Sequence, residues 1–404
     1  MKKLILLALV VLFIGCSPAA KNSARIYIDQ REYDKAKEQI LIGLQETPDD
    51  YELYCLLMKA EIGLGDWNRV SKAFQDGIKV DSVKAVNWML KDKNNIPIFK
   101  QAFYNAAVGL MDDEEYDGAL RNLKFCKILE PEDVNVYILE GGIYDKLGNK
   151  ELASQVYDKA LSIDPENPDA YFLIGKALFD KKSYDSCLVR FNGAIKYYEI
   201  KYKRITKVIF QNLSEFDKDL AQKIIKLWRG KKKDELDELV KVKLGIDAGL
   251  NAMQGNINKF YKTTDGLSQT YYRMGMAHYN LNNDSLALVN LFKSLEFMPD
   301  DSDALFYAGE LLIKTEKYQE AINYFGKLTQ LKDDDFYAWF YIAVCWTQLK
   351  EYKKAAGIYE DKVLVSDPKN IDAMTNLAYI YREMGNNKKS FEYLMKAEKL
   401  QKEQ

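Results

Sequence analysis

The sequence predicts an all-α fold in which antiparallel helix pairs stack into a solenoid, and three observations support this. A pattern of small and large apolar residues recurs about every 34 residues, a fixed period typical of helical repeat proteins. The 404-residue chain contains only 8 prolines and 22 glycines, so no flexible linker divides it. Its composition, 48% hydrophobic and 29% charged, favours an ordered chain that is rich in helix.

The repeated pattern is clearest at Ala153, Tyr157, Ala160 and Pro165. Antiparallel helices approach closely only where side chains are small, so we expect the small positions to lie at helix crossings. Proline has no N–H and disfavours helix in its predecessor, so it ends the second helix of a pair. Small residues recur at the position of Ala153, namely Ala36, Ala119, Cys187, Ala287, Ala321, Ala355 and Ser390. Others lie twelve positions earlier, namely Ala24, Ala107, Gly141, Gly175, Gly275, Gly309, Ala343 and Ala378.

This pattern resembles the tetratricopeptide repeat. Residues 169–175, Asp-Ala-Tyr-Phe-Leu-Ile-Gly, are similar to its opening, and residues 160–165, Ala-Leu-Ser-Ile-Asp-Pro, to its close. The resemblance implies a right-handed superhelical solenoid whose first helices line a concave surface. It covers residues 17–50, 51–84, 100–133, 134–167, 168–201, 268–301, 302–335, 336–370 and 371–404, and the repeat at 336–370 carries one extra residue before Pro368.

The repeat register divides the chain into successive segments. Residues 202–267 are predicted to be helical and basic, and they are either two decayed repeats or an insertion. The other predicted segments are a signal peptide at 1–15, two partly degenerate repeats at 16–84, an irregular or helical insert at 85–99, a first repeat block at 100–201 and a second at 268–404.

The N-terminal residues resemble a bacterial lipoprotein signal. Lys2 and Lys3 precede an apolar run from Leu4 to Ile14, which is too short to span a bilayer but has signal-peptide length. The run ends at Gly15-Cys16, which is similar to a lipobox and implies cleavage before Cys16 and lipid attachment to it. The alternative is an ordinary secretory signal in which Cys16 is incidental. We expect a protein that is lipid-anchored in the cell envelope, at the periplasmic side of the outer membrane.

The composition argues against nucleic-acid binding, metal sites and most kinds of catalytic site. The 58 Lys plus Arg nearly balance the 60 Asp plus Glu, so no global charge favours nucleic acid as a partner. The single histidine, His278, excludes most zinc sites and histidine-based triads, and we expect it to be a packed or edge-exposed core residue. The sequence has no phosphate-binding loop, dinucleotide fingerprint or CxxC motif. It predicts no enzyme activity, metal or cofactor.

Residues 199–264 carry 15 Lys plus Arg against 9 Asp plus Glu, and most of these cations lie at 199–233. This segment is either a basic patch for an anionic surface or acidic partner, or a solvated helix face.

The family's concave surface implies a partner-binding groove in this chain. The side chains at the corresponding positions are unusually apolar, and exposed apolar patches generally mark binding sites. Alternatively, these rings pack on one another inside a tightly wound solenoid. The predicted groove residues are Tyr104, Phe172, Phe179, Tyr272, Met276, Tyr279, Phe306, Tyr337, Phe340, Val344 and Tyr379.

The sequence therefore predicts a membrane-anchored scaffold that holds a protein or peptide partner in its groove. The alternative is a lipoprotein of an outer-membrane uptake system that binds a glycan or another small ligand.

Overall fold

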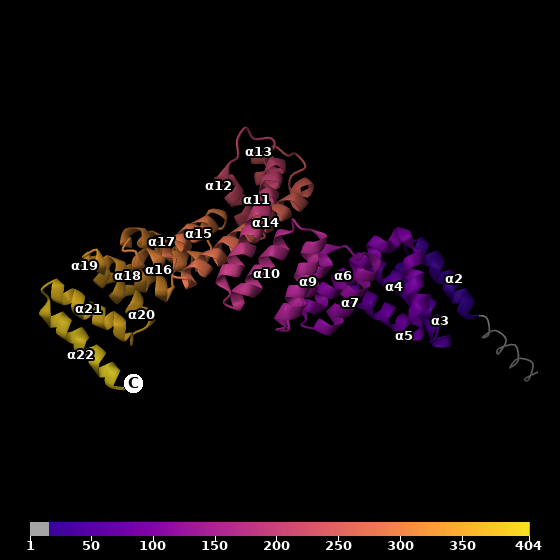
Figure 1. Cartoon of the computed structure of the whole chain (residues 1–404), viewed down its shortest axis with the longest axis horizontal. Coiled ribbons are helices and arrows are strands. Elements are labelled where there is room, and N and C mark those ends of the chain that lie inside the picture. Colours follow the sequence, from indigo (N-terminus) through magenta and orange to yellow (C-terminus); the bar gives the residue numbers. More distant parts are fainter. Residues whose placement is uncertain (1–15, 404) are drawn as a thin grey trace, which may run out of the picture. The chain divides into compact units, whose positions relative to one another are not determined.

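The computed structural model describes residues 16–403, whose regular elements are helices (Figure 1). No strand occurs in this part of the chain, and the predicted all-α fold of antiparallel helix pairs is confirmed. The predicted signal segment 1–15 lies outside the described residues, and so does the side chain of Cys16. Among residues 16–403, no helix has both the length and the apolar composition that a membrane-spanning segment requires. The described residues form two compact units, 16–165 and 166–403.

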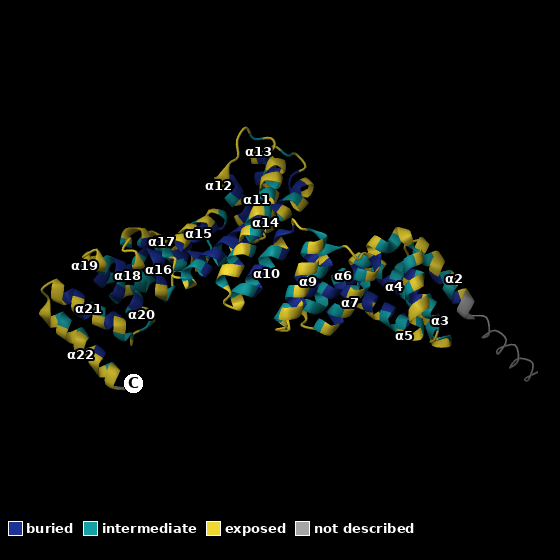
Figure 2. Cartoon of the chain, viewed as in Figure 1, coloured by how far each residue is buried: buried dark blue, intermediate teal, exposed yellow. Residues whose placement is uncertain are grey.

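The first unit consists of consecutive helix pairs. Its described helices are α2 (Cys16–Asp29), α3 (Tyr33–Glu46), α4 (Tyr51–Leu64), α5 (Trp67–Lys91), the short 3₁₀ helix η1 (Lys93–Asn95), α6 (Ile96–Asp112), α7 (Tyr116–Leu129), α8 (Val134–Lys146) and α9 (Lys150–Ile163). Buried residues, dark blue in Figure 2, recur along these helices. Phe74, Phe99 and Phe103 are buried in one apolar core of this unit.

Residues 85–99 prolong a helix between two repeats. A kink at Asp81, where the backbone is extended, turns α5 into a further helical stretch that runs to Lys91. Ala85 and Met89 on this stretch are fully buried against the same core as Phe99 on α6. The segment outside the repeat register therefore contributes apolar side chains to the first unit's core.

The second unit contains two long helices among the ordinary pairs. Its helices are α10 (Pro168–Asp180), α11 (Tyr184–Ile209), α12 (Lys218–Arg229), α13 (Lys233–Leu244), α14 (Leu250–Asn280), α15 (Asp284–Phe297), α16 (Ser302–Lys314), α17 (Tyr318–Leu331), α18 (Phe336–Gln348), α19 (Tyr352–Ile358), the π-helix η2 (Tyr359–Val363), α20 (Leu364–Ser366), α21 (Ile371–Glu383) and α22 (Asn387–Glu403). α11 and α14 extend beyond their repeats, and α12 and α13 pack against the ends of this extension (Figure 1).

The basic segment 202–267 thus comprises the end of α11, the α12–α13 pair and the start of α14. It has its own apolar core, in which Ile224 on α12, Val240 on α13 and Phe260 on α14 are fully buried. This core fixes the position of α12 relative to α14.

At the crossings formed by Gly175 and Gly309, the glycine on the first helix faces an aromatic ring on the second. A Cβ atom at Gly175 would lie 2.6 Å from the ring of Phe191, and one at Gly309 would lie 2.6 Å from the ring of Phe325. We expected small residues on both helices to face each other. Instead, the ring of Phe191, one helical turn after Cys187, fills the space beside Gly175. Only glycine leaves room for a ring against the helix backbone.

The extra residue in the repeat at 336–370 is accommodated by η2. A π-helical turn takes up an inserted residue without ending the helix, and here it interrupts the second helix of this pair. Tyr359 and Val363 at the two ends of the turn remain fully buried, so the core register is kept on both sides of it.

Two of the helices that carry predicted groove residues, α16 and α18, start at aspartate caps. Asp301 accepts a hydrogen bond from the backbone N–H of Ala304 at 3.0 Å, and Asp335 accepts one from the N–H of Ala338 at 2.9 Å. These bonds satisfy amide groups that the first turn leaves without partners, and they define where α16 and α18 begin.

Candidate partner-binding surface

The predicted groove residues lie in both units. Tyr104 is in the first unit, half-buried on α6 beside its core. The other residues lie in the second unit, where Tyr337 and Tyr379 are 62% and 42% exposed and the rest are half-buried. These are Phe172 and Phe179 on α10, Tyr272, Met276 and Tyr279 on α14, Phe306 on α16, Tyr337, Phe340 and Val344 on α18, and Tyr379 on α21.

A continuous series of ring contacts joins α14, α16 and α18. The ring of Tyr279 lies 6.0 Å from that of Tyr307, which lies 5.8 Å from that of Phe306. Phe306 in turn lies 5.7 Å from Tyr341 on α18, and Tyr341 lies 5.8 Å from Phe340. Edge-on geometry prevails among these contacts, as expected from the ring quadrupole. We call the residues Tyr272, Tyr279, Phe306, Tyr307, Tyr337, Phe340 and Tyr341 the aromatic surface.

Sequence reasoning missed Tyr307 and Tyr341, which connect the predicted rings. They directly follow Phe306 and Phe340 at the same position of consecutive repeats. That recurrence was visible in the sequence, but the family's groove positions do not include it. Without these two tyrosines, the ring contacts between Tyr279 and Phe340 would not form a continuous series.

The aromatic surface is backed by core residues. Phe306 lies 5.9 Å from the fully buried Phe325, and Phe340 lies 5.8 Å from the fully buried Tyr359. The rings therefore pack on one another and against the second helices, while their outer faces stay partly accessible. Such rings are held in place before a partner arrives, so little side-chain entropy is lost on binding.

The predicted residues on α10 and α21 have different neighbours. Phe179 lies 5.5 Å from Tyr184, and the guanidinium of Arg273 lies 5.6 Å from the ring of Phe179. Tyr379 lies 6.3 Å from Tyr352 on α19. The ring contacts of these residues are separate from the continuous series on α14, α16 and α18.

A carboxylate lies within the aromatic surface. Glu310 on α16 is half-buried, and this burial raises its pKa above the ordinary value. Its charge is the largest cause of the raised pKa of Tyr279, and it adds to the effect of burial on the pKa of Tyr341. The neighbouring Lys314 is paired with Asp284 at 2.8 Å. Glu310 is therefore a poorly solvated negative charge beside tyrosine rings, an environment that favours a cationic group.

The described residues show no arrangement for metal binding or thiol chemistry. They contain no cluster of three or more His, Cys, Asp or Glu side chains that could hold a metal ion. Burial lowers the pKa of His278, whose Nδ1 has no hydrogen-bond partner among the described residues. Burial also raises the pKa of the Cys345 thiol to about 12, so this thiol stays protonated. Cys55, Cys126, Cys187 and Cys345 are buried and unbridged.

Family models match three parts of the chain. The model "TPR repeat" matches residues 141–182, and models described as "Tetratricopeptide repeat" match residues 308–371 and 371–404. The chain contains tetratricopeptide repeats. The second match covers the end of α16 and the whole of α18, two of the helices that carry the aromatic surface, and the third covers α21 and α22.

Several known proteins are similar to parts of the chain. Superkiller protein 3 of Schizosaccharomyces pombe is 23% identical over 67% of this chain and 20% of that protein. The transcription factor tau 131 kDa subunit of Saccharomyces cerevisiae is 31% identical over 30% of this chain and 12% of that protein. The chain therefore spans a fifth or less of these relatives. A solved structure of PilF from Pseudomonas aeruginosa is 11% identical, with a TM-score of 0.39, over 77% of this chain and 100% of that one.

Tetratricopeptide-repeat proteins bind protein or peptide partners and are generally scaffolds without catalytic activity. The repeats found here therefore indicate a scaffold that mediates protein interaction.

Proposed function

We propose that the chain is a lipid-anchored scaffold of the bacterial cell envelope that binds a segment of a partner protein across the aromatic surface. The continuous series of partly accessible rings on α14, α16 and α18 carries this proposal. Clustered aromatic residues in well-packed surroundings commonly dominate binding energy, because they bury large areas at little entropic cost.

The position of Glu310 suggests the chemistry of the partner. A lysine or arginine of the partner would pair with this carboxylate and lie against the rings of Tyr279 and Tyr341, while apolar side chains contact Phe306. Pairing would also remove the unfavourable energy of a half-buried charge. The proposed partner segment is therefore basic and apolar, in an extended or helical conformation.

The proposed anchor is the lipid on Cys16. Several acyl chains, each CH₂ group contributing about 0.8 kcal/mol on burial, would hold the protein at the membrane. The motif Gly15-Cys16 supports this part of the proposal, and so does the apolar run before it. The periplasmic side of the outer membrane is the proposed location.

Site-specific photo-crosslinking in cells tests the surface directly. A photoreactive phenylalanine analogue at Tyr337, which is 62% exposed, should crosslink one defined protein that mass spectrometry can identify. The same analogue at Val289 on the second helix α15, which is 49% exposed, should not crosslink that protein. Equal crosslinking from both positions would contradict the proposed binding surface.

A further inference from the structure

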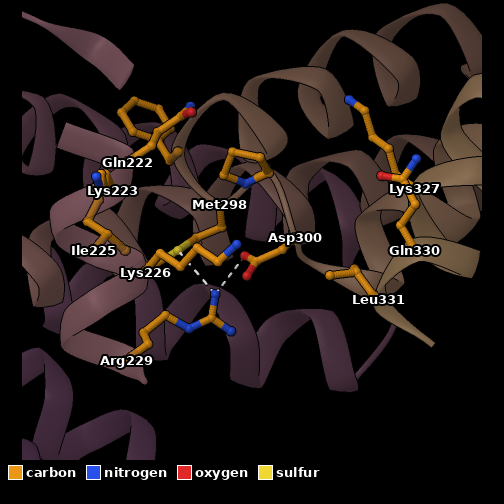
Figure 3. Close-up of a pocket in the computed structure, with 12 residues that line it drawn as sticks. Gln222, Lys223, Ile225, Lys226, Arg229, Met298, Asp300, Lys327, Gln330 and Leu331 are labelled. Carbon is orange, nitrogen blue, oxygen red and sulfur yellow. Dashed lines mark hydrogen bonds and ion pairs between the residues drawn. The ribbon is translucent and has the colours of Figure 1, made fainter. Parts of the chain in front are cut away.

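A recess of about 330 Å³ lies between α12, the turn from α15 to α16 and the end of α17 (Figure 3). We call it the α12 recess. Ile225, Met298 and Leu331 give it apolar walls, and the basic side chains of Lys226, Arg229 and others surround it. Its elements are α12 and two second helices, so it does not include the rings of the aromatic surface.

Positive charge around the recess is only partly neutralised. Arg229 is paired with Asp300, whose Oδ1 accepts from Nη1 at 2.7 Å, and it also contacts the sulfur of Met298 at 3.9 Å. Lys223 and Lys226 are exposed and form no ion pair among residues 16–403. Asp300 is the one carboxylate among the described lining residues.

The opposite wall brings a further lysine from a distant part of the sequence. Lys327 on α17 lies across the recess from the side chains of α12 (Figure 3). Its ammonium lies 5.3 Å from the ring of Tyr324, and within the described structure it forms no ion pair. Lysines on both walls are thus available to an anionic ligand that enters between them.

We propose that the α12 recess binds an acidic peptide segment of a partner protein. Carboxylates of the segment pair with Lys223, Lys226 and Lys327, and one apolar side chain of the segment packs against Met298 and Leu331. Complementary charge orients such a segment and speeds its association, whereas the apolar contact selects among acidic sequences.

The shape of the site favours a peptide over a membrane surface. The headgroups of a bilayer would meet exposed lysines on α11 and α12, but a flat surface cannot reach Met298, which is only 4% exposed. A peptide side chain can enter a recess of this volume. The proposal stands independently of the aromatic surface, whose proposed ligand is basic.

Fluorescence anisotropy with the full-length chain in neutral detergent micelles tests the proposal. The probe is a short fluorescein-labelled peptide of glutamates on both sides of a central leucine. The variant Lys223→Glu/Lys226→Glu should weaken its binding at least about tenfold. The matched control Lys201→Glu/Lys203→Glu changes the net charge equally at exposed positions of α11, outside the recess, and should weaken binding less than about twofold. Equal weakening by both variants would overturn the proposal, because binding of the probe would then depend only on the net charge of the protein.

A second pair of measurements tests the apolar contact. Leu331 is 49% exposed, so Leu331→Ser should fold normally. It should weaken binding of the leucine probe severalfold and leave unchanged the weaker binding of a probe with serine in place of leucine. If the serine probe binds the unsubstituted chain as tightly as the leucine probe does, the apolar contact is absent and the proposal fails.

Competition by lipid distinguishes a peptide from a membrane. Micelles that contain phosphatidylglycerol should displace the leucine probe no better than neutral micelles. The proposal is overturned if these micelles displace the probe efficiently from the unsubstituted chain and if their binding to the chain requires Lys223 and Lys226. The recess would then contact anionic lipid.

Discussion

The ring of Phe191 on α11 packs against the backbone of Gly175 on α10 and leaves no space for a side chain there. Gly175→Leu should therefore destabilise the protein by about 1–3 kcal/mol or more, because the two helices must separate. Gly326 on α17 is the matched control, since a Cβ atom there would meet nothing within 4 Å. Gly326→Leu should be neutral or stabilising, because leucine favours helix more than glycine does. Similar losses in thermal unfolding would show that the crossing is not as tight as described.

Glu360 on η2 joins this turn to α21 and α22. It accepts hydrogen bonds from the hydroxyls of Tyr381 and Tyr393, both at 2.8 Å, and from the ammonium of Lys389 at 3.2 Å. Burial opposes ionisation of Glu360, but these bonds outweigh it and hold its pKa below the ordinary value. We expect Glu360→Ala to destabilise the α21–α22 pair by about 1–3 kcal/mol.

The lowered pKa of Glu360 also determines how its contribution to folding stability changes with pH. A carboxyl whose pKa is depressed by folding contributes stability above its unfolded pKa, and this contribution is lost as the pH falls through the folded pKa. Hydrogen exchange of α21 and α22 should therefore differ between the wild type and Glu360→Ala at neutral pH. The difference should shrink in acid, and a difference that grows there would contradict the assigned role.

Cys16 is the proposed site of acylation. Cells fed a fatty-acid analogue should label the wild type and leave Cys16→Ala unlabelled. Cys55→Ala is a suitable control, because Cys55 is a buried residue of the first unit and its replacement should leave labelling intact. Equal labelling of the wild type and Cys16→Ala would remove the lipoprotein proposal.

The sequence predicts the helix pairs well because packing requires a small, buried residue at the same position of every repeat. Ala153, Cys187 and Ala321 were predicted from their spacing to be small packing positions, and all three are fully buried, although the ring that faces Gly175 belongs to Phe191 and not to Cys187. Ser390 in the last pair is only half-buried, and its hydroxyl donates to the carbonyl of Ala378 at 2.7 Å. The same spacing thus recurs in α22, although the packing around it is looser.

The surfaces are harder to predict because they depend on which side chains meet between distant elements. Periodicity placed Phe306 and Phe340 on first helices, but it did not show that Tyr341 connects these two rings or that Tyr307 connects Phe306 to Tyr279. The α12 recess was not predictable either. Lys223 and Lys327 are far apart in the chain, and they share one recess only because the core around Phe260 positions α12 beside the end of α17.

Glu310 provides a pH-dependent test of the partner's chemistry. Burial raises the pKa of Glu310, because the folded protein favours its protonated form. The stability that this form contributes is lost as the pH rises through the raised pKa and Glu310 ionises. Glu310→Gln should therefore raise the melting temperature at neutral pH and have little effect in acid below the ordinary pKa of glutamate. It should also weaken capture of a basic partner. A variant that is stabilised and yet binds the partner unchanged would show that Glu310 does not contact it.

Tyr337 separates a binding role of the aromatic surface from a structural one. Its side chain is 62% exposed, and its ring lies 6.5 Å from that of Phe306. Tyr337→Ala should change the free energy of unfolding by less than about 0.5 kcal/mol, as surface substitutions usually do. It should nevertheless reduce partner capture strongly, since an aromatic anchor commonly contributes about 2 kcal/mol or more to binding.

Phe340→Ala and Val289→Ala complete that test. Phe340 contacts the fully buried Tyr359, so its truncation should cost more than about 1 kcal/mol of stability, but less than the roughly 3–5 kcal/mol typical of a fully buried phenylalanine. Val289 lies on the second helix α15, so Val289→Ala should change neither the stability of the protein nor capture of the partner appreciably. If Tyr337→Ala captures the partner as well as Val289→Ala does, the rings only hold α16 against α18, and the partner binds elsewhere on the protein.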